Sequence, residues 1–82
     1  MLLVTKIVDQ PVLVVVEKGK PKRFFWVKRW VNVAGIIDKW NEVGRWWEDE
    51  KEKVFFRVLA AEGGIYEIYS DKKRWNLYRV YD

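Results

Sequence analysis

The spacing of apolar and polar positions predicts β-strands along most of the chain. Met1–Val8 and Val12–Val16 are rich in β-branched side chains, and Pro11 between them suits a strand start or a sheet edge. Lys18–Pro21 predicts a turn, because its glycine tolerates a positive φ and its proline disfavours a helical residue before it. These residues therefore predict the first hairpin.

The return strand of this hairpin, Lys22–Val31, is expected to be continuous. Alternation would place Phe24, Trp26, Lys28 and Trp30 on one face, and Arg23, Phe25, Val27, Arg29 and Val31 on the other. Both faces contain cations and apolar side chains. Whichever face is buried, the other one exposes a cation beside a large apolar group.

The segment Asn32–Val43 fits two periodicities. Alternation favours a strand to about Asp38, bulged at Gly35 and followed by a turn, since glycine weakens a helix. The alternative is a single helical turn over Asp38–Val43, because Ile36, Trp40 and Val43 fall at helical spacing.

Two more hairpins are predicted in the second half of the chain. The strands are Val54–Ala61, Ile65–Tyr69 and Arg74–Tyr81, joined by turns at Glu62–Gly64 and Ser70–Lys73. One face of the last strand should carry Trp75, Leu77, Arg79 and Tyr81.

These elements predict an all-β fold with residues 1–82 forming a single domain. About six strands would form a small antiparallel meander, and a flat meander would leave an apolar face uncovered. We therefore expect it to curl into an SH3-like barrel or a half-open roll. An OB-like barrel is the alternative, with its helix at Ile36–Val43.

Composition excludes several kinds of chemistry. The chain has no cysteine and no histidine, which removes disulfides, thiolate nucleophiles, the commonest metal ligand and the usual general base. The acidic side chains of Glu48–Glu52 are expected to form a solvated loop, and nothing in their spacing indicates a magnesium site. We expect a protein that is not an enzyme and has no cofactor or metal.

Charge is concentrated in the first half of the chain. The net charge is +4, and residues 1–41 hold eight Lys/Arg against three Asp/Glu, whereas residues 42–82 hold eight against nine. No apolar run is long enough for a membrane span, so we expect a cytoplasmic protein without membrane contact. One methionine, one glutamine and three asparagines favour a thermophilic source.

Cations and aromatic rings are interleaved on the predicted first hairpin. Single-stranded nucleic acid is bound by cations that follow its phosphates and by rings that stack on its bases. The alternative is that the rings form the core and the lysines only solubilise the surface. The residues we predict to contact nucleic acid are Lys18, Lys20, Lys22, Arg23, Trp26, Lys28, Arg29 and Trp30.

A second candidate surface surrounds the consecutive tryptophans. Adjacent residues of a strand point to opposite sides, so Trp46 and Trp47 cannot both enter one core from a strand. With Arg45 they could bind a protein partner, because Trp and Arg are enriched at interface hot spots. The alternative is that both indoles are buried.

Several segments also carry a family resemblance: Gly44–Trp47, Gly64–Tyr69 with Asp71, Trp75 and Val80–Asp82. Through them the chain resembles an uncharacterised family of small bacterial domains, filed as a domain of unknown function. Similar segments stand alone or form the C-terminal tail of Y-family polymerase-like mutasome proteins that support translesion DNA synthesis. The resemblance covers most of residues 22–82 and implies a role in DNA damage tolerance. It transfers no catalytic residues.

Together these observations predict a non-enzymatic binding module of DNA repair or translesion synthesis that contacts DNA through the basic aromatic hairpin. The alternative is a docking domain for a polymerase, clamp or mutasome protein that uses Trp46 and Trp47 without nucleic-acid contact. Pairing of edge strands between two copies would give a homodimer.

Overall fold

The computed structural model describes residues 5–43, 52–71 and 74–81, and these residues form one antiparallel sheet of seven strands. The strands are β1 (Thr5–Pro11), β2 (Leu13–Glu17), β3 (Lys20–Trp26), β4 (Arg29–Glu42), β5 (Lys53–Ala60), β6 (Ile65–Ser70) and β7 (Trp75–Tyr81). Their order in the sheet is β1-β7-β6-β5-β4-β3-β2. The predicted all-β meander is confirmed.

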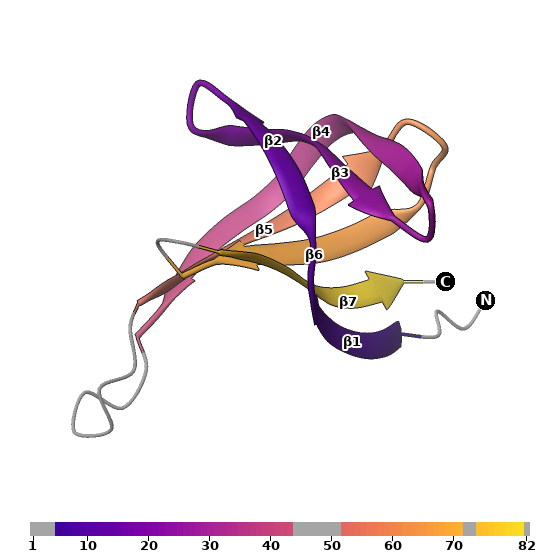
Figure 1. Ribbon diagram of the computed structural model, residues 1–82. Coiled ribbons are helices and arrows are strands. Elements are labelled where there is room, and N and C mark those ends of the chain that lie inside the picture. Colours follow the sequence, from indigo (N-terminus) through magenta and orange to yellow (C-terminus); the bar gives the residue numbers. More distant parts are fainter. Residues whose placement is uncertain (1–4, 44–51, 72–73, 82) are drawn as a thin grey trace.

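The sheet is curled into a half-barrel, because the two strands at its ends are consecutive in the chain. β1 pairs with β7 and β2 pairs with β3, and only Val12 separates β1 from β2 along the chain. The Val12 N–H donates a 3.0 Å hydrogen bond to the carbonyl of Trp75, the first residue of β7. Figure 1 shows β2 and β3 lying above β5 and β6 while β1 curls below β7.

The core fills the concave side of this half-barrel. Phe24 of β3 is fully buried and meets Tyr66 of β6 edge-on, with 5.1 Å between the ring centroids. The buried residues of this cluster are Val12, Phe24, Val31, Phe56, Val58, Ala60, Tyr66, Ile68 and Leu77. Rings from three strands thus supply the bulk that a small domain needs.

The continuous strand predicted over Lys22–Val31 is wrong, because the chain reverses at Val27 and Lys28. Both residues have positive φ, of 49° and 61°, as in a two-residue type I′ turn, and Trp26 then pairs with Arg29. The reversal moves Trp30 to the face opposite Phe24. Trp30 and Trp26 therefore lie on opposite faces of the sheet, whereas simple alternation predicts that they share one.

The turn predicted after Asp38, and the alternative helical turn, are also wrong, because β4 continues to Glu42. The bulge predicted near Gly35 is confirmed by a register shift between Val33 and Gly35. A second shift lies between Ile36 and Asp38, and it reverses the faces to which the side chains of the rest of the strand point. The helix that an OB-like barrel would need at Ile36–Val43 is therefore absent from the described part of this segment, which is strand up to Glu42.

A register shift in β7 changes the faces predicted for the last strand. Glu67 pairs with Arg79 and Ile68 with Leu77, so Tyr78 is the extra residue. Val80 consequently joins Leu77 against the core. Arg79 and Tyr81 no longer share the face of Leu77.

On the opposite face, this shift brings charged groups together around Glu67, whose exposed fraction is only 2%. Arg57 Nε donates a 3.1 Å hydrogen bond to Glu67 Oε2, and Arg79 Nε lies 4.0 Å from Oε1. The Tyr81 hydroxyl donates to the same carboxylate. Two cations and a hydroxyl thus compensate the buried charge.

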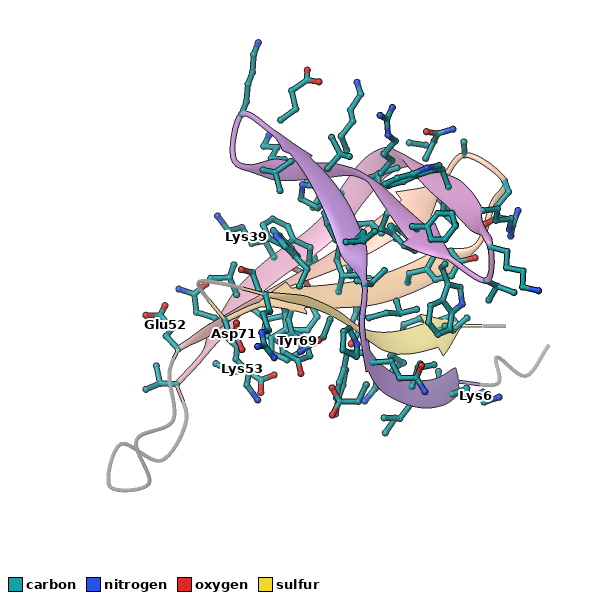
Figure 2. All side chains as sticks on the ribbon, in the orientation of Figure 1. Lys6, Lys39, Glu52, Lys53, Tyr69 and Asp71 are labelled. Atoms are coloured by element: carbon teal, nitrogen blue, oxygen red, sulfur yellow. The ribbon has the colours of Figure 1, made fainter. Side chains whose placement is uncertain are left out.

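Aromatic rings adjoin this ionic cluster, since Arg57 Cζ lies 5.3 Å from the centroid of Trp40 and 5.7 Å from that of Tyr81. Phe55 stacks on Trp40 with 5.3 Å between centroids, and it also contacts Tyr69 and Tyr78. Lys53 Nζ lies 5.2 Å from the Tyr69 ring centroid. In Figure 2, Tyr69 and Lys53 lie on the side of the sheet away from β2. The β4–β7 part of the sheet is therefore packed on both faces.

Among the described residues, the structure contains no helix of the length and apolarity required to cross a lipid bilayer.

Candidate nucleic-acid interface

The first candidate surface is the face of β2, β3 and β4 that points away from the core. Leu13 pairs with Phe25, and Phe25 with Trp30, so these three side chains form one row across the strands. A second row consists of Val15, Arg23 and Asn32. We call these two rows the outer face.

The apolar side chains of the outer face remain accessible to solvent. Trp30 is 44% exposed, Phe25 38% and Leu13 68%. Phe25 and Trp30 meet edge-to-face with 5.3 Å between centroids, and Arg23 Cζ lies 5.2 Å from the centroid of Trp30. These contacts restrict both the indole and the guanidinium, so the surface presents an ordered ring and an ordered cation.

Lysines lie at both ends of β3. Lys18 is in the β2–β3 turn, Lys20 and Lys22 are on β3 and Lys28 is in the β3–β4 turn, and all four are exposed. Lys22 Nζ is 3.9 Å from Glu17 Oε2, an exposed pair that contributes little stability. A positive field therefore extends along the hairpin from turn to turn.

Arg29 is less available than these lysines, because it is bound to Glu62. Its NH2 group donates a 2.7 Å hydrogen bond to Glu62 Oε2, and the Tyr66 hydroxyl donates to Oε1 at 2.8 Å. The hydrogen bond from Arg29 lowers the pKa of Glu62, with the Tyr66 hydrogen bond as the second cause, and the same pairing raises the pKa of Arg29. Arg29 thus joins β4 to the β5–β6 turn beside Trp30.

A small hollow of about 160 Å³ adjoins Trp30. It is lined by Arg29, Trp30, Val31, Asn32, Ala61 and Glu62. The Asn32 carbonyl accepts a 2.8 Å hydrogen bond from the Ala61 N–H, which connects β4 to the β5–β6 turn there. The hollow therefore lies between the exposed indole and the β5–β6 turn, with Asn32 and Glu62 among its lining residues.

The other residues predicted for these sites are placed differently. Trp26 is half-buried and packs against the core, on the face opposite Trp30. Arg45, Trp46 and Trp47 lie outside the described residues, so the prediction of a docking surface there remains a prediction.

Sequence reasoning did not include Leu13, Phe25 and Asn32 in the site. The alternation of Arg23 with Phe25 was visible in the sequence and could have identified the ring. Leu13 and Asn32 had no such signal, because their places depend on which strands pair and in which register.

The fold and this surface define a small basic β half-barrel with an exposed aromatic and cationic sheet face. The chain belongs to the family described as Domain of unknown function (DUF6504), which matches residues 1–82. No curated protein and no solved structure matches the chain. The family agrees with the resemblance noted in the sequence, and its description shows no link to polymerases.

Proposed function

We propose that this domain is a non-enzymatic module that binds single-stranded nucleic acid on its outer face. The observation that supports the proposal most strongly is the exposed Trp30 ring, which contacts Phe25 and Arg23 on a hairpin with a lysine at each end. Unpaired bases offer ring faces, and each base stacked on an aromatic side chain contributes about 1–3 kcal/mol. In duplex DNA these ring faces are covered by neighbouring bases.

The same face provides groups for the backbone and for base edges. Lys20, Lys22 and Arg23 carry positive charge along β3, and their contacts with phosphates would release condensed counterions. Asn32 lies beside Trp30 and could hydrogen-bond the edge of a stacked base. Few such groups are present, which favours binding that tolerates many sequences.

The proposed biological setting is DNA repair or translesion synthesis in the cytoplasm. This part of the proposal rests on the resemblance of Gly64–Tyr69 and the other segments to the tails of polymerase-like mutasome proteins. DNA would be the first partner, and a polymerase or mutasome protein would be the second.

The test is a fluorescence-anisotropy titration of the domain against a labelled oligothymidine at low and moderate salt. We expect affinity to fall with salt, and charge reversal of Lys20, Lys22 and Arg23 together should reduce the salt slope by about 2. Lys6→Glu is the matched control, because Lys6 is also exposed but lies on β1, well away from the hairpin (Figure 2). Binding that ignores salt and survives the triple reversal would refute the proposal.

A further inference from the structure

The two edges of the sheet differ in how they are protected against pairing with another chain. β1 carries a register shift between Ile7 and Gln10, a positive φ of 47° at Asp9, and Pro11. Bulges, prolines and charges are common means of blocking an edge. The β2–β3 ladder also shifts register, between Val15 and Val16, but there the extra residue, Lys22, lies on β3 and not on the edge strand. Among the residues of β2, only Glu17 is charged, and none is a proline. β2 is therefore the open edge of the described sheet.

A hollow of about 400 Å³ adjoins the open edge where the chain bends from β1 into β2. It is lined by Pro11, Val12, Leu13, Val14, Arg74 and Trp75. Its walls are mainly apolar, and its volume lies within the range of small-ligand sites. One or two apolar side chains would fit into it.

One cation lines this hollow, and a second lies two ring contacts away from it. Arg74 lines it directly, and Lys39 is connected to it through rings: Lys39 Nζ lies 5.5 Å from the Phe56 centroid, which is 5.8 Å from that of Trp75. Figure 2 shows Lys39 on the side of the sheet where β2 lies. Within the described residues, neither cation forms a side-chain ion pair. The nearby Asp71 carboxylate accepts a hydrogen bond from the backbone N–H of Arg74.

We propose that the open edge of β2 and the adjoining hollow together bind an extended peptide of another protein, which pairs with β2 as an additional strand. The unpaired N–H and C=O groups of β2 would continue the ladder, an apolar side chain would fill the hollow, and a carboxylate would meet Arg74 and Lys39. In the antiparallel orientation the carboxylate lies near the C-terminal end of the peptide, because β2 begins at the hollow and runs away from it.

Charge and backbone chemistry select this partner over two others. A second copy would bring another chain of net charge +4 against Lys18, which directly follows β2, and Lys20, which begins β3. Nucleic acid would satisfy the cations but has no backbone groups that complete a β-ladder. An acidic, apolar peptide satisfies the edge, the hollow and the cations together. The inference does not depend on the proposed function, which uses the outer face.

The test is binding of a labelled peptide in which valine and threonine alternate before a leucine and two C-terminal aspartates. We expect micromolar binding by the whole domain, with slower amide hydrogen exchange in β2 when the peptide is present. Arg74→Glu should weaken binding about tenfold, and a peptide with lysines in place of the aspartates should prefer this variant. Lys6→Glu should leave binding unchanged.

Two controls separate backbone pairing from adhesion to an apolar surface. Methylation of alternate peptide nitrogens removes donors without removing side chains, and it should abolish binding. Absence of binding at millimolar peptide, or equal binding of the methylated peptide, would overturn the proposal. The proposal would also be overturned if Arg74→Glu lost oligothymidine binding but bound the peptide as the wild type does. This result would assign the hollow and its cations to nucleic acid.

Discussion

The hydroxyl of Tyr69 donates a 2.8 Å hydrogen bond to Oδ1 of Asp9, which connects β6 to β1 across the intervening strand β7. Asn76 of β7 donates to the same hydroxyl at 2.8 Å. Asp9 can reach it because the register shift in β1 gives this residue a positive φ of 47°. The irregularity that protects the β1 edge therefore also fixes β1 to the sheet.

This arrangement predicts how stability changes at alkaline pH. Burial, followed by the hydrogen bond to Asp9, raises the pKa of Tyr69 to about 12. Because the folded-state pKa is above the ordinary value of about 10, the contribution of Tyr69 to stability is complete below pH 10 and is lost as pH rises towards 12. Tyr69→Phe should flatten the decline in unfolding free energy over that interval.

The measurement is urea unfolding at several alkaline pH values, with tyrosinate absorbance followed on the folded protein. The Tyr69 hydroxyl should ionise at a pH well above that at which an ordinary tyrosine does. Ionisation of all tyrosines of the folded protein near pH 10 would contradict this account. So would an equal decline of unfolding free energy with alkaline pH in the wild type and Tyr69→Phe.

The ionic cluster at Glu67 predicts a large loss of stability when its charge is removed. Glu67→Gln leaves Arg57 and Arg79 close together without their shared carboxylate, and it should lower the free energy of unfolding by about 3 kcal/mol. Glu17→Gln is the matched control, because its pair with Lys22 is exposed and should contribute less than about 0.5 kcal/mol. Equal effects of the two substitutions in chemical denaturation would show that the cluster is not a stabilising element.

The β3–β4 turn predicts a stabilising substitution. Val27 is 69% exposed and has a positive φ of 49°, which is unfavourable for a β-branched residue. Asparagine tolerates this conformation, so Val27→Asn should raise the free energy of unfolding by about 1 kcal/mol. Lys18→Asn, at the positive-φ position of the β2–β3 turn, replaces no β-branched residue and should change stability by only a few tenths of a kcal/mol. A thermal melt in which Val27→Asn is destabilised would be inconsistent with relief of backbone strain.

Comparison of the turns shows why sequence predicted some elements and missed others. Gly19 and Gly63 have positive φ at the turns that the sequence predicted, since glycine marks such conformations. The Val27–Lys28 turn carries no glycine or asparagine, and nothing local indicated it. Missing this turn placed Trp30 on the wrong face of the sheet.

Bulges in the longer strands also placed side chains on faces that sequence alternation did not predict. The register shift after Ile36 puts Trp40 on the face opposite Ile36, although their separation of four residues suggested a helix or a common strand face. Such shifts are set by pairing with distant residues, which a local pattern does not contain. For the same reason the sequence located the cations of the candidate interface but not Leu13 or Asn32.

The most direct test of the proposed function compares the affinity of Trp30 variants for labelled oligothymidine and for the corresponding duplex. Trp30→Ala should weaken single-strand binding by about 10-fold or more, and Trp30→Phe should retain most of the affinity because it keeps a ring for stacking. Ile7→Ala controls for loss of an exposed apolar side chain elsewhere, and circular dichroism confirms folding of each variant. Single-strand binding that depends on the ring at position 30 is the predicted result. Equal affinities of the wild type and a folded Trp30→Ala variant would contradict the account.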